Sequence, residues 1–136
     1  MGAATDIQNA YFDAIMAADF DRIREMYHPD YEFTDEEGVR HGIEGSLAKI
    51  RVYTDAFPGF TFEKHRQLDL GDVALMEATV RGVHSNDLRG VPATGRPVEM
   101  AYCNVMEIRD GRIYREHDYS DNLSLMRQLG VLEGVG

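Results

Sequence analysis

The order of two hydrophobic periodicities along the chain constrains the fold most. Apolar residues recur at helical spacing within residues 1–57, whereas residues 60–121 carry long segments of strand character. Pro58-Gly59 separates the two parts. Helices that come first and strands that follow one another indicate an α+β domain, because a parallel sheet would need crossover helices between its strands.

Three helices are expected in the N-terminal part. The first begins at Thr5-x-x-Gln8, whose spacing predicts a capping box. Asp19 is the predicted N-cap of the second helix. The third helix covers the apolar pattern from Leu47 to Phe57, and a short strand, Tyr31 to Thr34, is expected before it.

Long strands are expected in the rest of the chain, and Asp110-Gly111 between two of them is a hairpin signal. We therefore predict a curved antiparallel sheet with three N-terminal helices packed on it. An amphipathic tail from Leu123 to Val131 would close one end. The predicted strands are Phe60 to Leu70, Val73 to His84, Val98 to Arg109 and Arg112 to Asp121.

Length and charge limit the classes of partner. The 136 residues suit a single domain, 1–136, and the formal net charge of −10 argues against nucleic acid and anionic membranes as partners. The single cysteine, Cys103, cannot form an internal disulfide. No run of 18 apolar residues occurs, so no membrane span is expected and the cytoplasm is the default location.

Period-two alternation places polar residues on faces that are otherwise apolar. Asn104 interrupts an apolar stripe, so its amide is either satisfied structurally or directed at a ligand. His84 ends the apolar face of its strand. On the last strand, counting by two from Ile113 groups His117 with Asp121, which predicts a titratable cluster.

An ordered set of short motifs resembles the SnoaL-like polyketide cyclase family over nearly the whole chain. The motifs are Asp19-Phe20-Asp21, Tyr27-His28-Pro29-Asp30-Tyr31, Val83-His84, Gly90 to Arg96, Asp110-Gly111-Arg112-Ile113, Glu116 to Asp121 and Arg127-Gln128-Leu129-Gly130. The resemblance implies a cone-shaped α+β barrel of the nuclear-transport-factor-like superfamily. It also implies aldol ring closure without metal or organic cofactor, with Asp121 as acid/base and His84 as a pocket residue.

The front half also resembles ketosteroid isomerase, from the same superfamily. That resemblance implies Tyr11 as an oxyanion donor and Asp35 as a general base. The isomerase's second oxyanion-hole residue, an acid, is replaced here by Asn104.

Three functions follow as expectations. The first is a cofactor-independent acid/base enzyme, a cyclase acting on a hydrophobic carbonyl compound, with Asp121 as base, His84 beside it and His117 orienting the carboxylate. The second is an isomerase or dehydratase that uses Asp35 with Tyr11 and Asn104. The third is a binding domain for a small hydrophobic molecule without catalysis. A hydrolase acting on epoxides also remains open.

Each candidate residue also has a structural interpretation. Asp121 fits an N-cap of the tail helix, Asp35 a solvated turn, and Tyr11 the core stripe of its helix. His84 fits a satisfied core histidine. A metal site built from His84, His117 and Asp121 is conceivable, but no local metal-binding spacing supports it.

A homodimer is expected. The outward face of the strand Val73 to His84 carries Val73, Leu75 and Val83, and an apolar sheet face of this kind requires cover.

Overall fold

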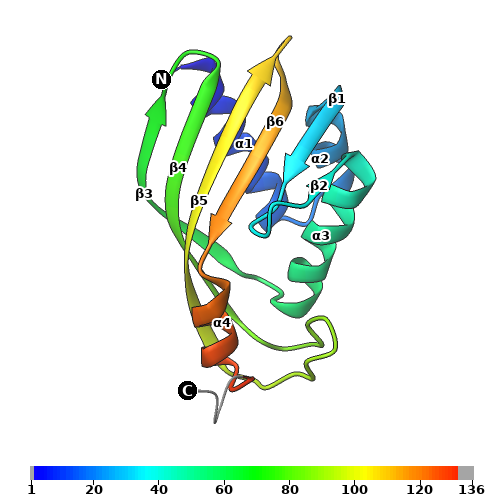
Figure 1. Cartoon of the computed structure of the whole chain (residues 1–136), viewed down its shortest axis with the longest axis vertical. Coiled ribbons are helices and arrows are strands. Elements are labelled where there is room, and N and C mark those ends of the chain that lie inside the picture. Colours follow the sequence, from blue (N-terminus) through cyan, green and yellow to red (C-terminus); the bar gives the residue numbers. More distant parts are fainter. Residues whose placement is uncertain (1, 132–136) are drawn as a thin grey trace.

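The computed structural model describes residues 2–131 and shows one curved, six-stranded sheet with α1 packed against one of its faces (Figure 1). The strand order is β2-β1-β6-β5-β4-β3, so β2 and β3 are edges and the sheet remains open. The expectation of an α+β domain with a curved sheet is confirmed, although the sheet does not close into a barrel.

Four helices occur in the described part of the chain, and three of them precede the long strands as predicted. Asp19 caps α2, because its Oδ1 accepts a hydrogen bond from the Arg22 amide at 3.2 Å. The capping-box prediction for the first helix is wrong. The helix begins earlier, and the buried Gln8 reaches the sheet instead. The helices are α1 (Ala3–Met16), α2 (Phe20–Met26), α3 (Ile43–Ala56) and α4 (Asn122–Gln128).

The long strands lie within a few residues of their predicted bounds, but the pairing is not wholly antiparallel. β1 pairs in parallel with β6, so the sheet is mixed. Alternation along one strand shows which residues share a face but not which strand lies next to it, and the sequence therefore did not reveal this pairing. The strands are β1 (Tyr27–Thr34), β2 (Arg40–His41), β3 (Thr61–Asp69), β4 (Val73–Val83), β5 (Pro97–Arg109) and β6 (Arg112–Ser120).

The turn between β5 and β6 confirms the predicted hairpin. Asp110 and Gly111 have φ values of 54° and 71°, and the favoured two-residue turn requires two positive values.

A bulge follows this turn in β6. Ile113 pairs with Ile108, but the next pair joins Glu107 to Arg115, so Tyr114 is an extra residue. Beyond the bulge, each β6 residue faces the side opposite to the one predicted by counting from Ile113.

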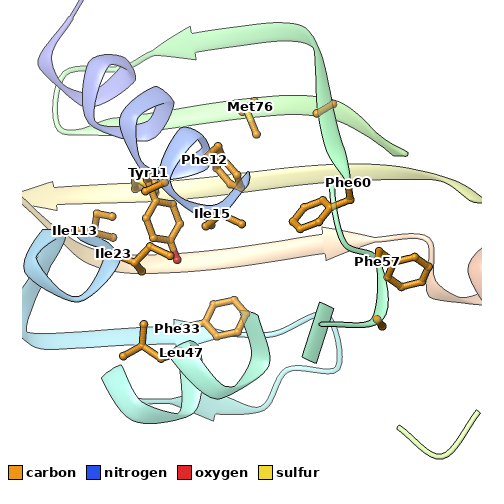
Figure 2. Close-up of a cluster of buried hydrophobic side chains, with 14 of the residues drawn as sticks. Tyr11, Phe12, Ile15, Ile23, Phe33, Leu47, Phe57, Phe60, Met76 and Ile113 are labelled. Carbon is orange, nitrogen blue, oxygen red and sulfur yellow. The ribbon is translucent and has the colours of Figure 1, made fainter. Parts of the chain in front are cut away.

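Buried side chains from both layers converge on the interior (Figure 2). Tyr11, Phe12 and Ile15 come from α1, and Phe33 comes from β1. Phe57 and Phe60 enter from the turn after α3. These side chains and the inner face of the sheet enclose the candidate site.

Candidate active site

A cavity of about 110 Å³ lies between α1, α3 and the inner face of the sheet. A cavity needs roughly 10–15 Å³ to hold one water molecule, so this cavity is large enough for an organic ring. Its wall is mainly apolar, with polar groups from α1, α3, β5, β6 and the turn after β1. The lining includes Phe12, Ile15, Phe33, Tyr53, Phe57, Phe60, Phe62, Val80, Met100 and Leu125, with the polar residues Tyr11, Glu36, Ser46, Lys49, Tyr102, Glu116, Asp118 and Ser120.

Two carboxyl groups on β6 reach this cavity. Glu116 and Asp118 pair with Met106 and Asn104 of β5, and directly opposed residues of an antiparallel pair face the same side. Glu116 is 5% exposed, whereas Asp118 is only half-buried because it opens to the cavity.

Asn104 joins the two carboxyl groups. Its Nδ2 donates to Glu116 Oε2 and to Asp118 Oδ1, each at 2.8 Å. Its Oδ1 accepts from Gln8 Nε2 at 3.0 Å, and Gln8 Oε1 accepts from Gln67 Nε2 at 2.9 Å. Because Gln8 donates to the amide oxygen, the amide nitrogen must face the carboxyl groups. The buried amide is therefore satisfied structurally.

Four hydroxyl groups and Glu116 form a closed circle of contacts, called here the hydroxyl ring. Glu116 Oε1 is hydrogen-bonded to the hydroxyls of Tyr31, at 2.5 Å, and Tyr11, at 3.0 Å. The Tyr11 and Tyr27 hydroxyls lie 2.8 Å apart. Ser46 Oγ closes the circle, at 2.9 Å from the Tyr27 hydroxyl and 3.0 Å from that of Tyr31.

Asp118 keeps one oxygen available. Its Oδ1 accepts from the Tyr102 hydroxyl at 2.5 Å and from Asn104. No hydrogen bond from residues 2–131 reaches its Oδ2. Because Asp118 lines the cavity, Oδ2 is the oxygen that can face a ligand.

The environment raises the pKa of both carboxyl groups. Burial and the nearby Asp118 charge raise the pKa of Glu116 to about 8, against the opposing hydrogen bonds from Tyr31, Asn104 and Tyr11. Burial also raises the pKa of Asp118, against hydrogen bonds from Tyr102 and Asn104. Adjacent carboxyl groups in a poorly solvated site titrate as a pair, and the second ionisation is disfavoured.

An ion pair lines another part of the cavity. Lys49 Nζ contacts Glu36 Oε2 and lies 4.8 Å from the centre of the Phe33 ring. Asn122 Nδ2 donates to Glu36 Oε1 at 2.9 Å. Lys49, the one cationic side chain that the described residues contribute to the lining, is therefore already paired with a carboxylate.

The predicted inward placement of Asp121 and His117 is wrong. Asp121 is exposed and caps α4, since its Oδ1 accepts from the Ser124 amide at 3.0 Å. His117 stacks on Tyr119, with ring centres 4.1 Å apart, on the face opposite the cavity. The bulge in β6 is the physical reason, because it reverses the alternation on which the prediction depended.

Asp35 does not line the cavity. Its Oδ1 accepts from the amides of Glu37 and Val39, each at 2.9 Å, and its Oδ2 lies 2.9 Å from His41 Nε2. Burial alone would raise its pKa, but these hydrogen bonds outweigh burial and lower it. Asp35 therefore stabilises the turn between β1 and β2, apart from Tyr11 and Asn104.

His84 is fully buried but does not line the cavity. Its Nδ1 accepts from the Thr94 amide at 3.2 Å and lies 3.0 Å from Thr94 Oγ1. Its Nε2 has no hydrogen-bond partner among residues 2–131. The ring packs 5.5 Å from Phe57 and holds the base of the loop before β5. The structure does not bring His84 together with Asp121.

The sequence interpretation missed Glu116, Asp118 and Ser46. A signal for the first two was present, because a Glu-x-Asp pair on a strand places two carboxyl groups on one face. Ser46 lies on α3, and nothing in the local sequence distinguishes it from an ordinary helix residue.

Within residues 2–131, no three or more His, Cys, Asp or Glu residues are grouped so that they could hold a metal ion. The conceived site of His84, His117 and Asp121 is therefore not assembled. No helix in the same part of the chain is long and apolar enough to span a membrane.

Solved structures resemble this fold over almost its full length. IdmH from Streptomyces antibioticus, described as a candidate polyketide cyclase, is 30% identical, with 93% of this chain and 98% of IdmH covered and a TM-score of 0.83. TsrD from Streptomyces laurentii is 27% identical, with 96% of each chain covered and a TM-score of 0.82. A candidate SnoaL-like cyclase from Jannaschia sp. CCS1 shares the fold at 21% identity, with coverage of 93% and 91% and a TM-score of 0.86.

No curated protein sequence matches the chain. The sequence profile of the SnoaL-like polyketide cyclase family matches residues 5–129, which is nearly all of the part described structurally. Its motifs and its fold agree with this match. The chain therefore belongs to the SnoaL-like polyketide cyclase family.

Proposed function

We propose that the protein is a cofactor-independent acid/base enzyme that closes a ring in a hydrophobic carbonyl compound of polyketide type. The observation that carries the proposal is a pair of adjacent carboxyl groups, the buried Glu116 and the half-buried Asp118, at an apolar cavity, with one oxygen of Asp118 free of hydrogen bonds from the described residues. Family membership and the similarity to IdmH, a candidate polyketide cyclase, support the same reaction class.

Asp118 is the proposed base. Its Oδ2 removes a proton from a carbon next to a carbonyl group, and its raised pKa makes the carboxylate a stronger base. Negative charge then develops on the carbonyl oxygen, and hydroxyl donors stabilise such charge. Tyr11 and Ser46 supply hydroxyls in the same cavity. The carbanion attacks a second carbonyl of the same molecule, and the new alkoxide takes up a proton.

The isomerase reading that uses Asp35 has no geometric support, because Asp35 lies in a turn outside the cavity lining. Tyr11 and Asn104 contact Glu116 instead.

The experiment is proton exchange into a simple hydrophobic ketone, 2-tetralone, in D₂O followed by NMR. The enzyme should accelerate deuterium incorporation next to the carbonyl, because that exchange requires only proton removal from carbon and stabilisation of the charge that develops on the carbonyl oxygen, without ring closure. Heat-denatured protein at the same concentration is the control. Ligand line broadening without accelerated exchange would support a binding domain and overturn the enzyme proposal.

A further inference from the structure

The hydroxyl ring contains five contacts between oxygen atoms. They join Glu116 to Tyr31, Tyr31 to Ser46, Ser46 to Tyr27, Tyr27 to Tyr11 and Tyr11 to Glu116, at 2.5 to 3.0 Å. All five residues are at least 95% buried. At these distances each contact requires one hydrogen between its two oxygens.

Counting hydrogens indicates which protonation state satisfies the hydroxyl ring. The four hydroxyl groups supply four hydrogens, one fewer than the contacts. If Glu116 is ionised, Tyr11 and Tyr31 donate to it, and the hydrogens of Tyr27 and Ser46 must serve three remaining contacts. One contact then joins two oxygens without a hydrogen. A proton on Glu116 Oε1 supplies the fifth hydrogen and satisfies the whole ring.

We infer that Glu116 carries a proton in the resting enzyme and passes it through the hydroxyl ring to the substrate oxygen, while Asp118 acts as the base. This inference rests on the proposed function for its catalytic part. The resting pair then has one acid and one carboxylate.

The surroundings favour this division of roles. Glu116 faces the neutral hydroxyls of Tyr11 on α1, of Tyr27 and Tyr31 on β1 and of Ser46 on α3, and no cationic side chain among residues 2–131 contacts it. Asp118 opens to the cavity beside Tyr102 of β5. The positive charge of Lys49 on α3 favours the carboxylate form of Asp118, whereas the negative charge of Glu36 disfavours it. Asn104 donates to both carboxyl groups at the same distance, 2.8 Å, and therefore does not favour protonation of one over the other. The proton therefore belongs on the more enclosed group, and the raised pKa of Glu116, about 8, agrees.

The proton transfers balance. Asp118 takes the proton from carbon, and Tyr11, which lines the cavity, donates its hydroxyl proton to the substrate oxygen on which the negative charge develops. Each ring hydroxyl then receives the hydrogen of its neighbour, and the last hydrogen comes from Glu116. One proton leaves carbon, one reaches oxygen, and the pair keeps a single negative charge. Return of the Asp118 proton to Glu116 by way of solvent resets the site.

Infrared difference spectroscopy tests the resting state without any substrate. The spectrum of the unmodified protein minus that of Glu116→Gln should show the C=O stretch of a protonated carboxylic acid at pH 7. Asp118→Asn serves as the second variant, and it should retain this band. A carboxylate band at pH 7 in place of the acid band would overturn the inference.

Ser46→Ala tests the ring itself. Without Ser46, three contacts remain for three tyrosine hydrogens, and an ionised Glu116 keeps both of its donors. The acid band should therefore titrate at a pH lower by about one unit, the scale of one hydrogen bond. Ser120→Ala is the matched control, because Ser120 lines the same cavity but lies outside the ring. Equal titration of the two variants would contradict the hydrogen count.

The catalytic part has its own readout. The rate of 2-tetralone exchange should fall as the pH rises through the value at which the acid band is lost. The exchange rate of Glu116→Gln should show no such fall at alkaline pH. An acid band without any exchange would overturn the proposed function and proton delivery to substrate, but leave the resting protonation intact. If the exchange rate of Glu116→Gln falls at the same alkaline pH as that of the unmodified protein, the catalytic role of Glu116 is overturned, but the proposed function is not.

Discussion

Replacing Glu116 with glutamine should change how protein stability depends on pH. The pKa of Glu116 is about 8 in the folded protein, compared with an ordinary value of 4.5. Between these two values the folded state holds a proton that the unfolded state has released, so stability is lost as the pH rises. The stabilising contribution of Glu116 is complete below pH 4.5 and disappears as the pH passes through about 8.

The expected size follows from about 1.4 kcal/mol per pH unit, which gives on the order of 4 kcal/mol between pH 5 and pH 8. Glutamine has the shape of the neutral acid but cannot ionise, so Glu116→Gln loses this dependence. Urea unfolding at unit steps of pH measures the difference between the two proteins. Glu25→Gln, at an exposed position on α2, is the matched control. Parallel stability curves for Glu116→Gln and the unmodified protein would refute the argument.

Three further predictions concern other parts of the structure. Asn104→Leu removes the three hydrogen bonds of the buried Asn104 amide. In urea titration it should lower the free energy of unfolding by on the order of 3–5 kcal/mol. A loss below about 1 kcal/mol would show that these hydrogen bonds are dispensable. His84→Ala should lower the free energy of unfolding by about 2–4 kcal/mol in thermal unfolding, because the shorter side chain leaves a void in the core. The rate of ketone exchange per folded molecule should stay within about twofold. A hundredfold loss of exchange would show that His84 belongs to the active site. Light scattering should give the mass of a dimer for the unmodified protein and of a monomer for Leu75→Glu on the outward face of β4, and a monomeric unmodified protein would exclude this interface.

The fold was largely predictable because long, regular patterns define its elements. The helical spacing before Pro58 and the hairpin signal at Asp110-Gly111 each reflect local chemistry, and both agree with the structure. The parallel pairing of β1 with β6 was not predictable, because it joins segments about 85 residues apart and local patterns do not encode such a contact.

The site was predicted on the correct strand but on the wrong face. One extra residue at Tyr114 exchanges the inner and outer sides of β6, so Asp118 took the place that had been assigned to Asp121. The capping interpretation of Asp121, which was weighed beside the catalytic one, describes its actual position. Asn104 was recognised as a buried amide, but its partners could be identified only after the bulge was known.

The central claim is that Asp118 on β6, and not Asp121 just beyond the end of this strand, removes the proton from carbon. Asp118→Asn and Asp121→Asn make the same chemical change three residues apart, and asparagine caps a helix about as well as aspartate, so Asp121→Asn should keep both fold and rate. In the 2-tetralone exchange assay at pH 7, we expect Asp118→Asn to lose at least about a hundredfold, the scale of general base catalysis. Equal rates for the two variants, or a larger loss for Asp121→Asn, would contradict the account.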